Sequence, residues 1–230
     1  MHCSIVMPAY NTEQYIGEAI QSIVDQDYKH WDLMVVDDGS DDHTFDVATR
    51  FCTDSRISVI RSKKNLGAAG ATKLGIDLVS GPLVTVVDSD DRIFSKSLSV
   101  VTPYFRAEPK LGFAWSNFIM SNGRVGWTRP LPSGVCLLDA MLKHNWWFAS
   151  HQRFFRKSFY LRSPQFNSKF RDASDYQLAI LMASTKCATE YIPQITYWYR
   201  INRPGSISKR REEQRRSHYG VKKWARKGFT

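Results

Sequence analysis

Three carboxylates stand within residues 88–91, directly after an apolar and β-branched run at 83–87 that follows a Gly-Pro break. This composition is typical of a strand that is buried on both faces. Like charges at a strand end repel one another, and a divalent cation offsets that repulsion. Mg²⁺ or Mn²⁺ takes one or two carboxylates and completes its shell with water and substrate phosphates. We therefore predict that Asp90 holds such a cation, assisted by Asp88 or Asp91; the alternative is a solvated acidic loop.

The segments before these carboxylates alternate between strand and helix patterns. We expect strands at residues 4–7, 31–36 and 57–60, and helices at 15–24, from Thr44 onward and at 68–79. The first helix has apolar residues at the spacing of a helix that covers a sheet, with Asn11 and Gln14 as candidate caps. This alternation predicts a parallel α/β sheet. Because the first two strands end in polar loops, a nucleotide crevice is expected at those ends.

The regular alternation ends after Arg92. We expect a helix at 95–108 that Pro103 kinks or ends, an antiparallel hairpin of 111–120 and 124–127, a helix at 135–143, a strand at 148–156, a helix at 174–183, and short strands at 189–192 and 196–200. In the helix at 174–183 we expect Leu178, Leu181 and Met182 to face inward. Neither a repeat nor a low-complexity linker interrupts these segments. The sequence therefore predicts one domain and an appended tail.

The net charge of +10 is concentrated in the tail, residues 209–230. Nine basic and two acidic residues give this tail +7, which leaves +3 for the rest of the chain. With no recognisable binding motif, this distribution argues against a nucleic-acid partner. Tyr219, Trp224 and Phe229 lie among the basic residues, a pattern that suits a helix on an anionic membrane. A solvated or disordered extension is the alternative.

The cysteines and the apolar segments bear on location. Cys3, Cys52, Cys136 and Cys187 are scattered and show no metal-ligand spacing, which favours reduced thiols in a cytosolic setting. The apolar run at the start is too short for a signal peptide, and no later stretch approaches the length of a membrane span. We therefore expect a cytoplasmic protein.

Several short motifs, each weak alone, occur in an order and spacing that resemble the family-2 glycosyltransferases. They are residues 4–11, 35–40, 65–67, 88–91, 174–176, 199–200 and 206–208. The resemblance implies an α/β protein of GT-A fold, with a Rossmann-like, mostly parallel central sheet flanked by helices and a small antiparallel part in the C-terminal half. It also implies a GT-A domain at 1–208, divided into a nucleotide-sugar-binding half (1–92) and an acceptor half (93–208), before a basic helical tail (209–230).

The resemblance implies contacts with a nucleotide-sugar donor in several loops. The residues are Pro8, Ala9, Tyr10, Asn11, Glu13, Asp38, Asn65, Gly67, Asp88, Ser89 and Arg200. Three of them have other readings, because Asp38 could cap the following helix, Tyr10 could belong to the core and Arg200 could be a solvated charge. The chain departs from the family at Thr72-Lys73, where Arg-Asn is common, although Lys73 could partly substitute as a cation.

The resemblance also assigns the catalytic base to Asp175. Ser174 occupies the first position of the family's acidic pair, so only Asp175 carries over. The residues alone leave a rival, since an acidic residue in a first helical turn is ordinary dipole stabilisation, and Asp172 could serve equally well.

These expectations define one function and two rivals. The predicted function is inverting transfer of a sugar from a nucleoside diphosphate donor, UDP-linked in our expectation, to a glycan or lipid-linked sugar hydroxyl with Mg²⁺ or Mn²⁺. It would take place in the cytoplasm at the face of the inner membrane. The rivals are a sugar-phosphate nucleotidyltransferase and a nucleic-acid-binding protein, but residues 8–11 are not the Gly-rich basic loop of a nucleotidyltransferase. Trp146, Trp147 and His151 could line an acceptor site, with buried core aromatics as the alternative.

Overall fold

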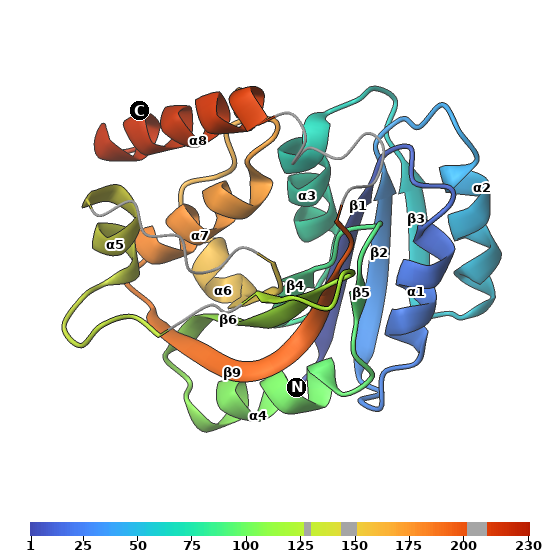
Figure 1. Ribbon diagram of the computed structural model, residues 1–230, viewed down its shortest axis with the longest axis horizontal. Coiled ribbons are helices and arrows are strands. Elements are labelled where there is room, and N and C mark those ends of the chain that lie inside the picture. Colours follow the sequence, from blue (N-terminus) through green and yellow to red (C-terminus); the bar gives the residue numbers. More distant parts are fainter. Residues whose placement is uncertain (127–129, 144–150, 202–210) are drawn as a thin grey trace.

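The computed structural model describes residues 1–126, 130–143, 151–201 and 211–230. Within them one mixed sheet has the strand order β3-β2-β1-β4-β8-β6-β9-β5, with β7 paired to β6 (Figure 1). The strands are β1 (Cys3–Ala9), β2 (Trp31–Asp37), β3 (Ile57–Arg61), β4 (Leu83–Val86), β5 (Arg92–Ile93), β6 (Leu111–Met120), β7 (Val125–Gly126), β8 (Arg153–Arg156) and β9 (Ala188–Tyr199). The helices are α1 (Ile16–Val24), α2 (Thr44–Thr49), α3 (Gly67–Leu78), α4 (Ser97–Ala107), α5 (Leu137–Lys143), α6 (Lys157–Tyr160), α7 (Ser174–Ser184) and α8 (Arg211–Arg226).

The first half is the parallel part of the sheet. Strand β1 pairs in parallel with β2 and with β4, and β2 pairs in parallel with β3, as the alternation predicted. The carboxyl ends of β1, β2 and β4 therefore lie at one edge of the sheet, which we call the loop edge. The polar loops after these three strands meet there.

The second half adds antiparallel strand pairs to the sheet, which confirms the prediction of a sheet with both parallel and antiparallel pairs. Strand β8 lies antiparallel between β4 and β6, with Arg153 opposite Val86 and Trp115. Because β8 runs against β4, its first residue lies at the loop edge. The hairpin of β6 and β7 also forms as predicted. The short elements β5 and α6 were not predicted.

One prediction in this half is wrong, because β9 is a single strand rather than two short ones. Pro193 carries no N–H, which favours a break in a strand pattern. The ladder with β6 shifts register between Ser116 and Asn117, and this irregularity accommodates the proline. The Asn117 side chain donates to the Pro193 carbonyl at 2.8 Å, so the side chain compensates for the interrupted ladder.

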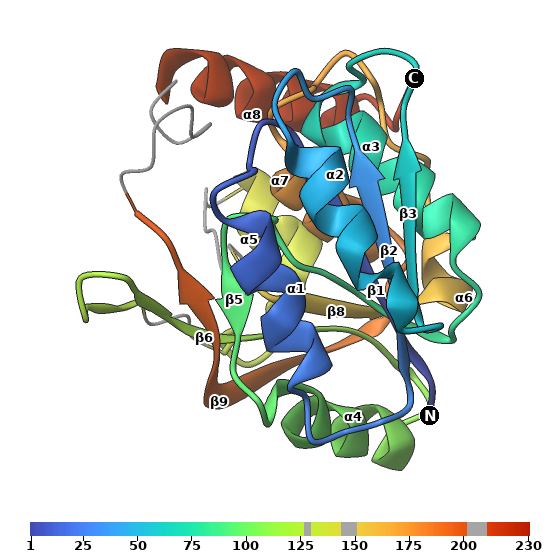
Figure 2. The same cartoon turned by 90° about the vertical axis from the view of Figure 1, so that its right-hand side faces the viewer.

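Helices cover both faces of the sheet. One core cluster contains residues of α1 and α4, and the other contains residues of α3, α5 and α7. Figure 2 shows α1 and α2 in front of the parallel strands, with α3 behind them. Along β1, Ile5 and Met7 belong to one cluster while Val6 belongs to the other. Burial on both faces explains why these strands are apolar runs rather than alternating ones.

Two predictions about helix ends need correction. Helix α1 begins after Tyr15 without a side-chain cap. Asn11, a predicted cap, instead accepts a hydrogen bond from the Asp41 backbone N–H at 3.0 Å. Helix α4 continues beyond Pro103, which lies on its exposed side, while Val101 and Phe105 are buried. Packing of these apolar residues holds the helix together, and water can reach the turn that lacks a donor.

Helices α7 and α8 form an extra layer on one face. The eight consecutive residues Tyr176 to Ala183 are all buried, whereas the sequence pattern predicted only one inward face. The reason is that α8 covers α7 from outside, with Val221 and Ala225 buried in the same core cluster (Figure 1). The predicted tail is thus helical and packed. Among the described residues, no helix has the length and apolar character needed to cross a bilayer.

Candidate active site

The carboxylates after β4 lie at the loop edge, but they do not share one environment. Asp88 and Asp90 are half-buried, whereas Asp91 is only 1% exposed. The two carboxylate oxygens of Asp91 accept hydrogen bonds at 2.8 Å from the Tyr197 hydroxyl and the Arg200 backbone N–H. Burial, together with the charges of Asp90 and Asp88, raises the pKa of Asp91 well above its ordinary value. These contacts favour a structural role for Asp91, in place of the predicted metal contact.

Asp88 and Asp90 remain as candidate cation ligands. Among the described residues, no three His, Cys, Asp or Glu side chains form a group that could hold a metal by themselves. Two carboxylates nevertheless fit Mg²⁺ or Mn²⁺, because these ions complete their coordination with water and substrate phosphates. The donor set therefore suits a cation that arrives with a phosphorylated substrate.

Ser89, predicted to contact the donor, is buried and tied to the first loop. The Thr12 hydroxyl donates to the Ser89 hydroxyl at 3.1 Å, and the Thr12 backbone N–H donates to Thr44 at 2.7 Å. Thr12 thus joins the loops after β1, β2 and β4. The Ser89 side chain holds the loops together rather than facing solvent.

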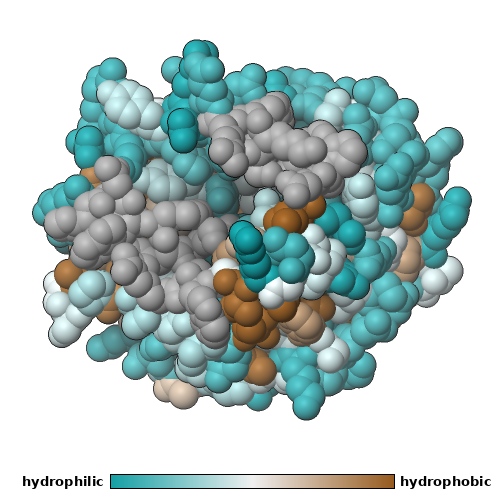
Figure 3. Space-filling model, in the orientation of Figure 1, coloured by the Kyte–Doolittle hydropathy of each residue, from teal (hydrophilic) through white to brown (hydrophobic). Residues whose placement is uncertain are grey.

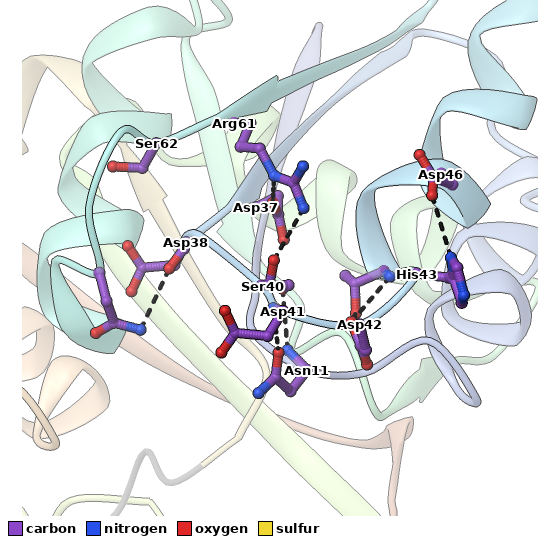
Figure 4. A network of polar contacts seen from close by, with 12 residues as sticks. Asn11, Asp37, Asp38, Ser40, Asp41, Asp42, His43, Asp46, Arg61 and Ser62 are labelled. Carbon is purple, nitrogen blue, oxygen red and sulfur yellow. Dashed lines mark hydrogen bonds and ion pairs between the residues drawn. The ribbon is translucent and has the colours of Figure 1, made fainter.

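The loop after β1 is fastened to the loop after β2 by side chains (Figure 4). Asn11, at a positive φ of 50°, donates its backbone N–H to Ser40 at 3.0 Å. Glu13 accepts from the His43 backbone N–H at 2.9 Å. Pro8 and Ala9 end β1, while Tyr10 is 43% exposed, which excludes the core reading of Tyr10.

Asp38 caps a helix, but not the one that the alternative reading named. Its carboxylate accepts from the backbone N–H groups of Leu66 and Gly67 at 2.7 and 2.8 Å, at the start of α3. Asp42 instead accepts from the Thr44 N–H at 2.9 Å. Burial raises the pKa of Asp38, although these hydrogen bonds oppose the shift. The Gly67 N–H is thereby occupied and is not free for a phosphate.

Arg171 is a residue at this site that the motifs missed. Its guanidinium donates to the backbone carbonyl of Asn65 at 3.1 Å and to the Asn65 side chain. Gly67 has φ of +77°, and a Cβ there would lie 2.8 Å from the Arg171 Cβ. Arg171 therefore packs directly on the Asn65-Leu66-Gly67 loop. The available sequence signal was only a basic residue just before the acidic positions 172 and 175.

Asp175 lies in the first turn of α7, as predicted, and beside the buried guanidinium of Arg153. Its carboxylate accepts from the Tyr176 backbone N–H at 2.7 Å and lies 3.8 Å from the Arg153 guanidinium. Arg153 stands opposite Val86 of β4, which places Asp175 next to the strand that leads into the carboxylates. Asp172, the rival, precedes the first helical residue by two positions and lies outside the helix.

Arg200 is packed at the carboxylate loop and is not a solvated charge. Its Nε donates to the Asp90 backbone carbonyl at 2.9 Å, and its Nη2 pairs with Glu18. The guanidinium lies over the rings of Tyr15 and Trp198, at 4.8 and 4.6 Å from their centroids. Arg200 therefore lies beside the residues expected to receive a diphosphate.

His151 belongs to an aromatic cluster. Its ring lies 4.0 Å from that of Phe118 and 4.2 Å from that of Tyr199, and it stacks on Tyr197. Burial, with the charge of Arg153 adding to it, lowers the pKa of His151 to about 3. These contacts favour the core reading of His151. Trp146, Trp147 and the motif at 206–208 lie outside the described residues.

Comparison with known proteins settles the family. The model of "Glycosyl transferase family 2" matches residues 4–178. This chain belongs to glycosyl transferase family 2. The match contains the carboxylate loop and Asp175, whereas β9 and α8 lie beyond it, so the family model does not reach Arg200.

Two relatives are glycosyltransferases by their names, and the name of the second includes a lipid-linked sugar. Glycosyltransferase GlyG of Streptococcus pneumoniae is 35% identical over 46% of this chain and 35% of its own length. UDP-Glc:alpha-D-GlcNAc-diphosphoundecaprenol beta-1,3-glucosyltransferase WfgD of Escherichia coli is 34% identical over 54% of this chain and 49% of its own length. The matched parts thus span between about a third and a half of these relatives.

Solved structures show the same fold. Staphylococcus aureus TarS 1-349, in complex with UDP-GlcNAc, superposes with a TM-score of 0.74 at 21% identity, covering 90% of this chain and 61% of that one. The mannosyltransferase PcManGT of Pyrobaculum calidifontis, in complex with GDP-Man and Mn²⁺, gives 0.70 at 19% identity, covering 95% and 63%. The likeness confirms the GT-A type of α/β fold for this family-2 chain.

Proposed function

We propose that this chain catalyses inverting transfer of a sugar from a UDP-linked donor to a hydroxyl of a glycan or lipid-linked saccharide. The observation that carries the proposal is that, in a family-2 chain, Asp88 and Asp90 follow β4 at the loop edge while Asp175 faces Arg153, the residue of β8 that pairs with the end of β4. The WfgD relative uses UDP-Glc by its name, and TarS was solved with UDP-GlcNAc. Both support a UDP-sugar as the donor.

Asp88 and Asp90 hold the cation in this proposal. A bound Mg²⁺ or Mn²⁺ supplies a Lewis acid that stabilises the charge developing on the leaving diphosphate. The Mn²⁺ complex of PcManGT supports a divalent cation in this fold. Arg200, whose guanidinium is already fixed beside the Asp90 carbonyl, adds a positive charge on the same side.

The loops after β1, β2 and β3 hold the nucleotide. The exposed ring of Tyr10 is available to the base, and the bonded Asn11 and Glu13 keep that loop in place. The Asn65 side chain donates to the Asp38 backbone carbonyl, and the Asp38 carboxylate accepts from the Gly67 N–H, so both residues fix the Gly67 turn. Pro8, Ala9 and Ser89 line this donor site as packed residues and do not supply exposed polar groups to it.

Asp175 acts as the general base. The acceptor oxygen attacks the anomeric carbon while the bond from that carbon to the diphosphate oxygen breaks. The hydroxyl proton passes to the Asp175 carboxylate, and the nucleoside diphosphate leaves with the bonding electron pair. Attack from the face opposite the leaving group inverts the anomeric centre. A positioned carboxylate in this role contributes roughly 10²–10⁴-fold to the rate.

A screen of nucleotide sugars tests the proposal. We expect metal-dependent release of UDP from a UDP-sugar, and loss of metal-dependent UDP binding in Asp90→Ala. Asp139→Ala, which removes a surface carboxylate of α5 paired with Lys143, is the matched control and should behave as wild type. Release of pyrophosphate from a nucleoside triphosphate and a sugar phosphate would instead indicate a nucleotidyltransferase.

Contact with the cytoplasmic face of an anionic inner membrane is a further part of the proposal. Helix α8 exposes Arg215, Arg216 and Lys223, and Lys227 just after it is exposed too. Hydrophilic side chains dominate the upper left of the face in Figure 3, where this helix lies in Figure 1. Trp224 packs against Phe170 and Phe229, whereas Tyr219 is 68% exposed, so Tyr219 is the predicted aromatic residue available beside the electrostatic contact. The name of WfgD includes a diphosphoundecaprenol-linked acceptor, which supports such a location.

A further inference from the structure

The carboxylate loop is held from one side by the end of β9. Tyr197 is 1% exposed, and its hydroxyl donates to Asp91 while accepting from the Asp88 backbone N–H at 3.2 Å. Three residues later, Arg200 donates its backbone N–H to Asp91 and its Nε to the Asp90 carbonyl. Three residues of the loop are thus each bonded to Tyr197 or Arg200.

This arrangement addresses a physical difficulty of the loop. Asp88 and Asp90 carry like charges at a strand end, and their repulsion favours their separation before a cation arrives. A metal site also depends on outer contacts that fix the direction of its ligands. The bonds from β9 fall on the loop backbone and on Asp91, and they leave the Asp88 and Asp90 carboxylates to other partners.

We propose that Asp91 and Tyr197 are positioning residues that hold Asp88 and Asp90 in the arrangement that binds the cation, and that Asp91 is not itself a ligand. This inference rests on the proposed function of the site. The buried Asp91 carboxylate serves as the anchor, and the Tyr197 hydroxyl connects that anchor to the backbone of Asp88. We call this pair the clasp.

Tyr197→Phe tests the clasp because it removes one hydroxyl and keeps the ring. The matched control is Tyr191→Phe on the same strand. The Tyr191 hydroxyl accepts a hydrogen bond from the Asn117 side chain at 2.8 Å, and this contact does not involve the carboxylate loop. We would measure Mn²⁺ binding by electron paramagnetic resonance, and UDP binding by calorimetry with Mn²⁺ and with EDTA. Thermal unfolding of both variants measures any general loss of stability.

We expect Tyr197→Phe to weaken Mn²⁺ binding and Mn²⁺-dependent UDP binding about tenfold, the size of one lost hydrogen bond of about 1.4 kcal/mol, while UDP binding in EDTA is unchanged. Tyr191→Phe should bind Mn²⁺ as wild type does. Equal Mn²⁺ affinity of folded Tyr197→Phe and wild type would overturn the clasp. Absence of Mn²⁺-dependent UDP binding in the wild type would instead overturn the proposed function.

A double-mutant cycle separates an anchor from a ligand. If Asp91 acts through the clasp, Asp91→Asn and Tyr197→Phe weaken the same interaction, and the double variant loses less Mn²⁺ affinity than the sum of the two single losses. If Asp91 binds the cation directly, Asp91→Asn alone should remove Mn²⁺ binding as completely as Asp90→Asn does. That second result would contradict the inference even with Tyr197→Phe impaired.

Discussion

Two regions meet the loop edge: the loops proposed to hold the nucleotide, which we call the donor side, and the region around Asp175, which we call the base side. They are held in place in different ways. On the donor side, loops after β1, β2 and β3 bond to one another through side chains and backbone groups. The bond between Asn11 and Asp41 (Figure 4) and the bond between Asp38 and Gly67 are examples. On the base side, Asp175 bonds to the backbone of its own helix and faces Arg153 at 3.8 Å. The donor loops are therefore built before any substrate binds, whereas the base is held by a helix and one long charge contact.

Because of this difference, we expect the donor side to determine substrate affinity and the base side to determine the rate of the chemical step. Preformed hydrogen bonds on the donor side spare the ordering of loops when a nucleotide binds, which favours affinity. The Asp175 oxygen that faces Arg153 at 3.8 Å can accept a proton in the transition state. Substitutions on the two sides should consequently change different kinetic constants.

The largest effect is expected at Asp175. Asp175→Asn should keep UDP and metal affinity but lower the transfer rate by roughly 10²–10⁴-fold, since the carboxylate acts in the transition state. Asp172→Asn is the control and should cost far less, because Asp172 lies outside α7. The measurement is turnover beside calorimetry with UDP. Equal activity of the two variants, or a dead Asp172→Asn, would show that the base is assigned wrongly.

The next largest effect is expected for the basic residues at α8, the helix that covers α7 on the base side. Replacing Arg215 and Lys223 of α8, and Lys227 just after it, by Gln should weaken binding to anionic vesicles by about 100-fold, because three basic residues near the surface add about 3 kcal/mol. The packed residues Val221 and Ala225 are untouched, so the fold and UDP release should persist. Vesicle sedimentation at rising salt is the measurement, and wild-type binding should fall with ionic strength. Unchanged binding by the triple variant would remove the membrane contact from the proposal.

The two sides also differ in what the sequence could predict. Donor-side strands are apolar runs with polar loops at their ends, and local rules locate them within a residue or two, as for β1 and β3. The pairing of β6 with β9 and the cover of α8 over α7 depend on contacts between distant segments. A period-based reading therefore divided β9 at Pro193 and underestimated the burial of α7.

The site residues follow the same rule. Asp38 and Asp175 stand in motifs that the family resemblance singled out from the sequence. Arg153, Arg171 and Tyr197 contact those motifs from elements far away in the chain, and no spacing in the sequence links them. The motif also offered Asp91 as a metal contact, because a motif gives the order of side chains and not their directions; in our proposal Asp91 positions the ligands instead.

A smaller effect is expected at Gly67, on the donor side. Gly67→Ala should weaken UDP binding about tenfold, because a Cβ there lies 2.8 Å from Arg171 and displaces the loop. Gly123→Ala is the matched control, since Gly123 has φ of +80° and nothing within 4 Å, so it carries the backbone strain without the clash. Calorimetry with UDP measures both. If the two variants bind UDP equally well, the Arg171 contact has no role in holding the donor loop.

The last prediction concerns folding stability and tests whether His151 is packed in the aromatic cluster on the base side. The pKa of His151 falls from an ordinary 6.5 to about 3 on folding, because burial and Arg153 disfavour its charged form. Between these values the unfolded chain binds a proton that the folded chain does not, so the free energy of unfolding falls as pH is lowered through that window. From about pH 7 to about pH 5 the wild type should lose roughly 2 kcal/mol more than His151→Phe does.

Urea unfolding at both pH values measures this difference. His43→Phe is the control, since the His43 side chain is 81% exposed on the donor side and should leave the wild-type slope unchanged. A His151→Phe slope equal to that of the wild type would mean that His151 takes up its proton freely in the folded state. The ring would then be open to solvent at the loop edge, and the reading of His151 as an acceptor contact would replace the packed aromatic cluster.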